Sequence, residues 1–198
     1  MRIITINVNG IRSAQRKGFF TWLEAQDADV ICVQETKAQV DQLSDPVFHP
    51  AGYHCFYYDA EKKGYSGTAI YARQKPDKIT RGLGWDPCDS QARYLQADFP
   101  GISVISMYVP SGSSNDEALA RKLDFHDRIM PHFKALRRKR REFVICADWN
   151  TCHKPIALNN WKPNQKHSGF LPIERAWLHA LYDEAGYVAA FRLPNPNA

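Results

Sequence analysis

The chain has 198 residues, of which 44% are apolar and 24% are charged. This is the composition of an ordinary globular domain, and the length suffices for one domain with a substantial core. No apolar run approaches the length of a transmembrane helix, and the N-terminal MRIITINVNG lacks the apolar region and cleavage site of a signal peptide. The net charge of +5 mildly favours an anionic partner such as nucleic acid. Composition therefore argues against a membrane protein and a secreted one.

The cysteines are few, odd in number and scattered. They form no CxxC pair, and two of them lie within apolar runs, where cysteine behaves as a small hydrophobic residue. This usage favours reduced thiols in a cytoplasm. The five are Cys32, Cys55, Cys88, Cys146 and Cys152. No feature of the sequence indicates oligomerisation, so a monomer is expected.

Short apolar runs alternate with helical segments along the chain, which is typical of an α/β domain. The close spacing of the runs between residues 54 and 108 indicates that part of the sheet is antiparallel. The predicted strands are Arg2–Ile6, Asp29–Gln34, His54–Tyr58, Ser66–Ala72, Tyr94–Phe99, Ile102–Tyr108 and Glu142–Ala147.

Four helices are predicted, three between these strands and one after the last of them. The first covers Phe19–Gln26, and a shorter one covers Ala38–Leu43. The longest begins with Ser114 or Asn115 as its N-cap and runs towards Leu136, with a kink or a break at Pro131. The last begins at Pro172, a favourable first helical position, and ends before Gly186.

A basic run, Arg137 to Arg141, follows the longest predicted helix. Cations at a helix C-terminus stabilise the helix dipole, so the run is interpreted first as a solvated helix end. A secondary phosphate contact is the alternative.

Apolar runs that are predicted to form strands end repeatedly in polar side chains. In α/β sheets, functional sites gather beyond the carboxyl ends of strands. Alternation along a strand places residues two apart, such as Asp148 and Asn150, on one face. Asp and Asn are also ordinary strand-stop and turn residues, and this remains the alternative for any one pair. The strand-end residues are Asn7 and Asn9, Glu35, Tyr108, and Asp148 with Asn150.

These side chains have a common chemical use. Carboxylates and amide carbonyls are hard oxygen ligands suited to Mg²⁺ or Mn²⁺, and a divalent ion beside a phosphate polarises the phosphoryl group. Asp148 is suited to position or deprotonate a water, and Asn150 to donate a hydrogen bond to a phosphate oxygen. Tyr108 is suited to donate to the phosphate, although a strand-end aromatic that packs on the sheet is an equal interpretation.

Six short motifs occur in a family order that covers essentially the whole chain. They are NVNGIR (7–12), QETK (34–37), GYSGTAIYAR (64–73), YVPSG (108–112), ADWN (147–150) and SGFLPIERAW (168–177). Together they resemble the exonuclease III family of DNA-repair nucleases, within the endonuclease/exonuclease/phosphatase superfamily. The resemblance implies a four-layer α/β sandwich of two packed mixed β-sheets with helices outside. It also implies Mg²⁺-dependent (or Mn²⁺-dependent) phosphoester hydrolysis on duplex DNA with abasic sites or blocked 3′ ends.

The resemblance also implies roles for individual residues. Glu35 is the main metal ligand with Asn7 beside it, and Asp148 and Asn150 complete the candidate ligand set. Tyr108 and Asp148 are catalytic, and Asn150 contacts the scissile phosphate. The expected DNA-binding residues are Asn9, Arg12, Lys37, Tyr65 and His167. For any single one of them, an ordinary solvent-exposed side chain is the alternative.

The chain departs from the family pattern near its end. Members of the family carry a Gly-x-Arg-x-Asp-Tyr motif and a Ser-Asp-His motif after the segment that matches SGFLPIERAW, and neither occurs here. We therefore expect one domain over residues 1–198 that is truncated at its C-terminus. The favoured explanation is that the sequence is a portion of a longer product, and the alternative is a short protein that is inactive or completed by another chain. The sheets would expose apolar edges, so the 198 residues alone are expected to be poorly soluble and to lack nuclease activity.

His167 lies in the segment PNQKHSGF, which corresponds to the loop lining the family's pocket for an abasic sugar. An imidazole there is bulky, and we expect it to favour 3′-end processing over internal abasic cleavage. An exposed loop histidine is the alternative.

Two rival functions remain. One is a superfamily phosphatase acting on a non-DNA phosphoester such as a phosphoinositide headgroup. The other is a non-catalytic DNA-binding module that lacks the C-terminal motifs.

Overall fold

The computed structural model describes residues 1–195, and these residues form two compact units. The first unit contains Met1–Tyr108 and Arg140–Asp148. The second contains Val109–Lys139 and the chain from Trp149 onward. The prediction of a single domain over the whole chain stays a prediction.

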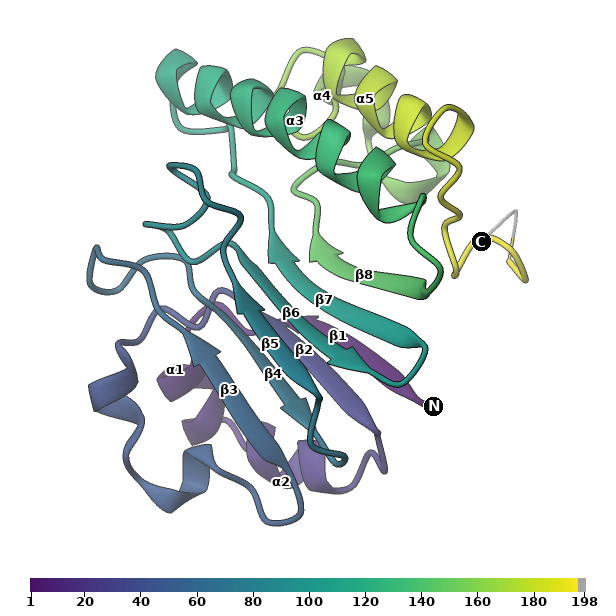
Figure 1. Cartoon of the computed structure of the whole chain (residues 1–198). Helices are drawn as coiled ribbons and strands as arrows, with labels where there is room; N and C mark the ends of the chain where they lie inside the picture. Colours follow the sequence, from purple (N-terminus) through teal and green to yellow (C-terminus); the bar gives the residue numbers. More distant parts are fainter. Residues whose placement is uncertain (196–198) are drawn as a thin grey trace. The chain divides into compact units, whose positions relative to one another are not determined.

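The first unit holds two four-stranded mixed sheets (Figure 1). One sheet has the strand order β1-β2-β4-β3, and only its β1 and β2 pair in parallel. The other sheet has the order β5-β6-β7-β8, and only its β7 and β8 pair in parallel. The strands of the first sheet are β1 (Ile3–Asn7), β2 (Val30–Gln34), β3 (His54–Tyr58) and β4 (Thr68–Ala72). Those of the second are β5 (Lys78–Arg81), β6 (Tyr94–Phe99), β7 (Ile102–Tyr108) and β8 (Glu142–Asp148). The predicted mixed pairing is therefore confirmed.

The two sheets pack face to face through a buried apolar layer. Cys32 and Ile70 of the first sheet and Leu95, Val104 and Cys146 of the second belong to this layer, and four of these five side chains are fully buried. Alternating positions of β2 point the other way, where α1 (Ile11–Arg16) and α2 (Phe19–Glu24) cover them. The predicted fold of two packed mixed sheets with helices is confirmed.

The second unit is built on α3 (Asp116–Leu136) and α5 (Pro172–Asp183), with the short helix α4 (Trp161–Asn164) between them in sequence. Asn115 caps α3 by accepting a hydrogen bond from the backbone N–H of Ala118 at 2.8 Å, as the sequence predicted. The buried side chains of α3 recur at helical spacing, and Leu178 and Leu181 are buried on α5. The prediction of a break at Pro131 is wrong, because α3 continues across it.

Other predicted boundaries need small corrections. The segment Ala38–Leu43 is a short 3₁₀ turn over Val40–Leu43, and β4 begins two residues after the expected Ser66. The sequence did not predict α1, α4 or β5. Each is short, and helices or strands of four to six residues give little periodicity to detect.

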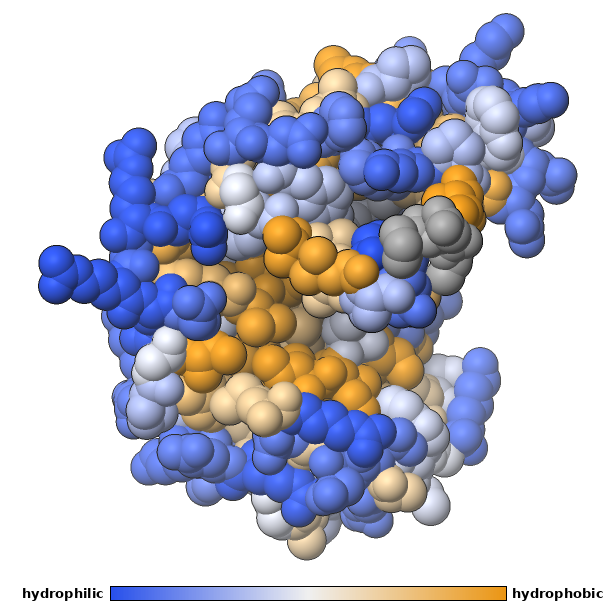
Figure 2. All heavy atoms as spheres, turned by 90° about the vertical axis from the view of Figure 1, so that its right-hand side faces the viewer, coloured by the Kyte–Doolittle hydropathy of each residue, from blue (hydrophilic) through white to orange (hydrophobic). Residues whose placement is uncertain are grey.

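Apolar side chains remain partly exposed on the edge strands β1 and β8. Ile3 and Ile6 of β1 and Phe143 and Ile145 of β8 are half-buried, and in β8 only Cys146 is buried. Figure 2 shows apolar side chains gathered in the middle of the face that lies at the right of Figure 1.

Within residues 1–195, no helix combines the length and the apolar character needed to span a membrane.

Candidate active site

The parallel strand pairs bring the predicted site residues of the first unit together. In β7 and β8, Tyr108 and Asp148 are register partners at the ends of the two strands. In β1 and β2, Asn7 is the partner of Gln34, the residue before Glu35. The carboxyl ends of parallel strands meet at one edge of a sheet, which is why residues far apart in sequence converge here.

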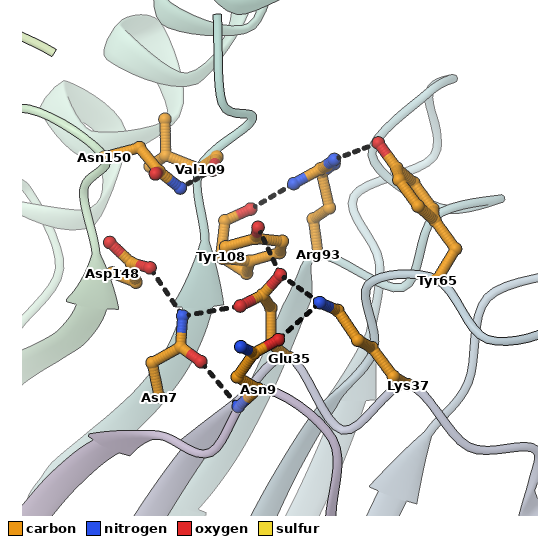
Figure 3. A network of polar contacts seen from close by, with 10 residues as sticks. All are labelled: Asn7, Asn9, Glu35, Lys37, Tyr65, Arg93, Tyr108, Val109, Asp148 and Asn150. Atoms are coloured by element: carbon orange, nitrogen blue, oxygen red, sulfur yellow. Dashed lines mark hydrogen bonds and ion pairs between the residues drawn. The ribbon is translucent and has the colours of Figure 1, made fainter. Parts of the chain in front are cut away.

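The amide of Asn7 lies between the two carboxylates of the site (Figure 3). Its Nδ2 donates a hydrogen bond of 2.9 Å to Glu35 Oε2 and one of 2.7 Å to Asp148 Oδ2. Its Oδ1 accepts a hydrogen bond of 2.8 Å from the backbone N–H of Asn9. One side chain therefore joins both acidic residues that the sequence singled out.

Glu35 makes further contacts through its other oxygen. Oε1 accepts a hydrogen bond of 2.8 Å from the Tyr108 hydroxyl and lies 3.1 Å from Lys37 Nζ. Burial alone would raise the pKa of Glu35, but the hydrogen bonds from Asn7, Tyr108 and Lys37 outweigh it, so the pKa lies below its usual value. Glu35 is therefore an anion at neutral pH.

The backbone that carries Glu35 is strained. Glu35 and Lys37 adopt φ angles of 57° and 48°, a left-handed conformation that costs non-glycine residues on the order of 1–3 kcal/mol. The backbone N–H groups of Thr36 and Lys37 donate to Gly67 and Ser66, at 3.1 and 2.9 Å. A Cβ atom on Gly67, whose φ is 87°, would lie 2.2 Å from Thr36 Oγ1, so this approach requires glycine. The loop before β4 thus holds Glu35 in its unusual conformation.

Polar contacts between the two sheets fix the strand ends near the site. The buried side chain of Gln34 donates to Ser106 Oγ at 3.1 Å and to the Cys146 carbonyl at 3.3 Å. Ser106 donates in turn to the Val33 carbonyl at 3.0 Å. Ser106 and Cys146 lie two residues before Tyr108 and Asp148, so these bonds set the spacing between the two halves of the site.

Arg93 is a site residue that was not predicted from the sequence. Its side chain is 1% exposed, and its guanidinium lies 4.9 Å from the centre of the Tyr108 ring. It donates to the Tyr108 carbonyl at 2.9 Å and to the Tyr65 hydroxyl at 3.0 Å. Burial and the hydrogen bond to Glu35 raise the pKa of Tyr108, and the Arg93 charge opposes that shift. No local signal marks Arg93, because it precedes an ordinary strand.

Asn150 does not continue the strand that ends at Asp148. The expectation that both residues share one strand face is wrong, because β8 ends at Asp148 and Asn150 has a φ of 48°. Asn9 leaves β1 in the same way, with a φ of 46°. Asparagine tolerates this left-handed conformation better than most residues. Asn150 belongs to the second unit, where its Nδ2 donates to the Val109 carbonyl at 2.9 Å.

Three of the predicted DNA contacts lie close to one another in the first unit. Arg12 and Lys37 line a hollow of about 320 Å³, together with Gly10, Ser13 and Arg16. Lys37 Nζ donates to Asn9 Oδ1 at 2.6 Å. The hollow therefore presents three cationic side chains, of which Arg16 was not predicted.

His167 is exposed and lies in the second unit, in a turn between α4 and α5. Its backbone N–H donates to the Asn164 carbonyl at 3.0 Å, and its carbonyl accepts from the Phe170 N–H at 3.1 Å. Its effect on substrate choice stays a prediction.

The donors of the first unit suit a hard divalent cation. Glu35 and Asp148 share one hydrogen-bond donor, so a cation bound beside the Asn7 amide would have carboxylate oxygens on two sides. No group of three His, Cys, Asp or Glu side chains within residues 1–195 is arranged to hold a metal ion. A Mg²⁺-type site uses one or two carboxylates with water and substrate oxygens, and Glu35 and Asp148 are two such carboxylates.

Comparison with known proteins identifies the family. The model of the endonuclease/exonuclease/phosphatase family matches residues 4–197. The chain belongs to this family. It is 34% identical to an exodeoxyribonuclease of Bacillus subtilis over 198 residues, which is 77% of that protein. It is also 34% identical to the DNA repair nuclease APEX1 of Danio rerio, of which it spans 62%.

Solved structures show the same endonuclease/exonuclease/phosphatase fold. An AP endonuclease from Archaeoglobus fulgidus superposes with a TM-score of 0.88 at 30% identity, over 98% of this chain and 75% of that one. A Neisseria 3′ phosphatase bound to a product DNA hairpin superposes with a TM-score of 0.84 at 22% identity, over 99% of this chain and 75% of that one, which speaks for the fold alone. The family is one of enzymes, and the relatives named here with at least 30% identity are nucleases.

Proposed function

We propose that the chain carries the metal-binding and phosphate-binding residues of a DNA-repair phosphoesterase that acts on duplex DNA. The observation that carries the proposal is the Asn7 amide, which is hydrogen-bonded to both Glu35 and Asp148. Two carboxylates held around one polar group form a ready site for a cation. The family membership supplies the reaction class, and the nuclease names of the relatives support DNA as the substrate.

Glu35 is the principal ligand for Mg²⁺ or Mn²⁺ in this proposal, with Asn7 and Asp148 beside it. When bound, the cation polarises the phosphoryl group and stabilises the charge that develops on the leaving oxygen. Lys37 and Tyr108 keep Glu35 ionised and oriented through their contacts with Oε1. Asn150 was also predicted as a ligand, and we assign it first to the phosphate.

Phosphate binding falls to hydrogen-bond donors. An amide nitrogen carries two N–H donors, and the one that Asn150 gives to Val109 fixes the rotation of its side chain. The Tyr108 hydroxyl has one hydrogen, which it donates to Glu35 here, and in this proposal it donates that hydrogen to the phosphate when DNA is bound. Asp148 accepts a proton from the attacking water or orients that water. Asn150 and Tyr108 thus stabilise the phosphate, while Asp148 acts on the nucleophile.

The DNA backbone is the expected partner of the basic hollow. Arg12, Arg16 and Lys37 supply cationic side chains for phosphates that flank the reactive one. Tyr65 is 36% exposed, and its hydroxyl accepts a hydrogen bond from Arg93. Its ring supplies a flat apolar surface next to Ser66, which has a positive φ angle. Contacts of this kind position the DNA and read little sequence.

A finer prediction, on substrate choice, belongs to the same proposal. His167 narrows the sugar pocket, so 3′-phosphate or 3′-nucleotide removal exceeds abasic cleavage, and His167→Gly raises the latter. A His167→Gly protein that gains no abasic cleavage would contradict this prediction.

Equilibrium binding of duplex DNA tests the proposal without requiring turnover. The affinities for duplexes ending in a 3′ phosphate and in a 3′ hydroxyl are compared in Mg²⁺ and in EDTA, for the protein and for Glu35→Gln. We expect Mg²⁺ to strengthen binding of the 3′-phosphate duplex selectively, and Glu35→Gln to abolish that gain. Equal affinities in Mg²⁺ and EDTA would contradict the metal site.

The same experiment separates the rival functions. DNA binding that is insensitive to divalent ions supports a non-catalytic DNA-binding module. Weak, salt-insensitive DNA binding together with hydrolysis of a phosphoinositide headgroup supports a superfamily phosphatase on a non-DNA substrate, because phosphate contacts with DNA release counterions and are salt-dependent.

A further inference from the structure

A fully buried ion pair joins the two main helices of the second unit. Lys122 of α3 and Glu174 of α5 lie 2.6 Å apart between Nζ and Oε1, and both side chains are 0% exposed. Charges cost several kcal/mol each to remove from water and are retained only where their geometry and further hydrogen bonds compensate. The contacts of each partner therefore indicate what the pair does.

Glu174 fastens the loop that precedes α5. Its Oε1 accepts from Ser168 Oγ at 2.9 Å, and its Oε2 accepts from the backbone N–H groups of Gly169 and Leu171 at 2.7 and 3.0 Å. Burial acts to raise the pKa of Glu174, and the Lys122 charge with these donors lowers it, so the carboxylate stays ionised. The segment immediately after His167 is thereby tied to one buried anion.

Lys122 makes a second contact, with the candidate phosphate-binding residue. Its Nζ donates a hydrogen bond of 2.6 Å to the backbone carbonyl of Asn150. Asn150 is in a left-handed conformation, and Gly169 lies so close that a Cβ there would be 3.4 Å from the same carbonyl oxygen. The ammonium group thus contacts the backbone of the residue whose side chain donates to the Val109 carbonyl.

We propose that Lys122 is a positioning residue for Asn150, and that Glu174 couples this position to the loop at residues 167–171. The inference rests on the proposed function of Asn150 as a phosphate contact. The Lys122–Glu174 ion pair thus fixes the position of Asn150 and the position of the loop that carries His167. The simpler alternative is that the pair only stabilises the packing of α3 on α5.

The test combines a binding measurement with a direct observation of Asn150. The side-chain NH₂ resonance of Asn150 is followed by NMR in ¹⁵N-labelled protein, and affinity for 3′-phosphate duplex DNA is measured in Mg²⁺. Asn150→Ala assigns the resonance and is expected to weaken binding on the order of tenfold, as for one hydrogen bond to a charged group. Lys122→Met is expected to shift or broaden the Asn150 resonance and to weaken binding by a similar factor.

Non-additivity distinguishes positioning from stability. In the Asn150→Ala background, Lys122→Met should cause little further loss, because residues that act through one another are not independent. Lys122→Arg, which keeps a cationic donor, should recover most of the affinity. Ile129→Ala, which removes a buried side chain of α3, serves as the stability control and should lower the melting temperature without moving the Asn150 resonance. If the Lys122→Met protein does not fold, the double variant Lys122→Met/Glu174→Gln, which removes both charges, is used in the same measurements.

The failures are separable. If Asn150→Ala leaves the affinity unchanged, the proposed function of Asn150 fails, and the inference fails with it. If Asn150→Ala weakens binding while Lys122→Met does not, or if the two losses multiply, only the positioning role is overturned.

Discussion

The hydroxyl of Tyr108 donates a hydrogen bond of 2.8 Å to Oε1 of Glu35, across the two packed sheets of the first unit. The tyrosine ends β7 and the glutamate follows β2. Each changes the ionisation of the other: the bond lowers the pKa of Glu35 and raises the pKa of Tyr108. At neutral pH the pair is therefore a neutral phenol beside a carboxylate.

Tyr108→Phe removes that donor and little else. We expect the pKa of Glu35 to rise towards its usual value and the Mg²⁺-dependent gain in DNA affinity to shrink. A hydrogen bond to a charged group contributes about 1.5–3 kcal/mol, which is the expected weakening. The pKa is measured by a ¹³C NMR titration of the Glu35 carboxyl. Tyr53→Phe removes a hydroxyl bonded to the Ala28 carbonyl and should change neither quantity.

Asn7→Asp places a third carboxylate between Glu35 and Asp148. In EDTA this like-charge contact should lower stability by about 1–3 kcal/mol, because the amide that bridged the two anions is lost. Mg²⁺ should restore stability, by about 2.7 kcal/mol at a concentration of 100 times the dissociation constant. Thermal unfolding in EDTA and in Mg²⁺ measures both effects. Asn160→Asp, at the start of α4, should lack the Mg²⁺ dependence, and an Asn7→Asp protein indifferent to Mg²⁺ would argue against a cation site.

His126 gives the second unit a specific pH dependence. The side chain is 2% exposed and stacks on Trp177 at 4.2 Å between ring centres, and burial lowers its pKa to about 4. In the unfolded chain its pKa is about 6.5, so the unfolded state binds the proton first. The contribution of neutral His126 to the free energy of unfolding is complete above pH ~6.5. It is lost as the pH falls from ~6.5 to ~4, and the total loss is about 3 kcal/mol.

His126→Phe removes the titrating group and keeps a ring against Trp177. Urea unfolding at pH 7 and at pH 4.5, followed by tryptophan fluorescence, should show a smaller pH-dependent loss for the variant than for the protein. Equal losses would show that another group titrates over this interval.

Arg12→Ala tests the basic hollow. Each phosphate contact adds about −0.9 to the slope of log affinity against log salt concentration. We expect the variant to bind duplex DNA more weakly, with no change in sequence preference. We also expect the slope to become less steep by the amount that one phosphate contact contributes. Lys75→Ala removes an exposed cation outside the hollow and serves as the control. A slope unchanged by Arg12→Ala would remove this residue from the DNA interface.

The sequence predicted the strands well because apolar runs bounded by polar residues are local signals. His54–Tyr58, Tyr94–Phe99 and Ile102–Tyr108 were predicted with the bounds that the structure gives. It overestimated the effect of Pro131. Proline lacks one N–H, but apolar residues on both sides of it, Ile129 and Phe133, are buried in the core, and their burial keeps α3 continuous.

The site was predictable in part, for a related reason. Asn7, Glu35, Tyr108 and Asp148 each follow or end a strand, and parallel pairing brings such ends together. Arg93 and Lys122 were not predictable, because their importance depends on which distant groups they meet in the fold. The left-handed turns at Asn9 and Asn150 were missed because strand alternation was extended past the point where pairing stops.

Titration with Mn²⁺ tests the central claim most directly, because the paramagnetic ion broadens the NMR resonances of the nuclei nearest to it. We predict that substoichiometric Mn²⁺ broadens the resonances of Asn7, Glu35 and Asp148 first, that excess Mg²⁺ reverses the broadening, and that Glu35→Gln abolishes it. Broadening that spares these three residues, or that persists unchanged in Glu35→Gln, would contradict the assignment of this cluster as the metal site of a phosphoesterase.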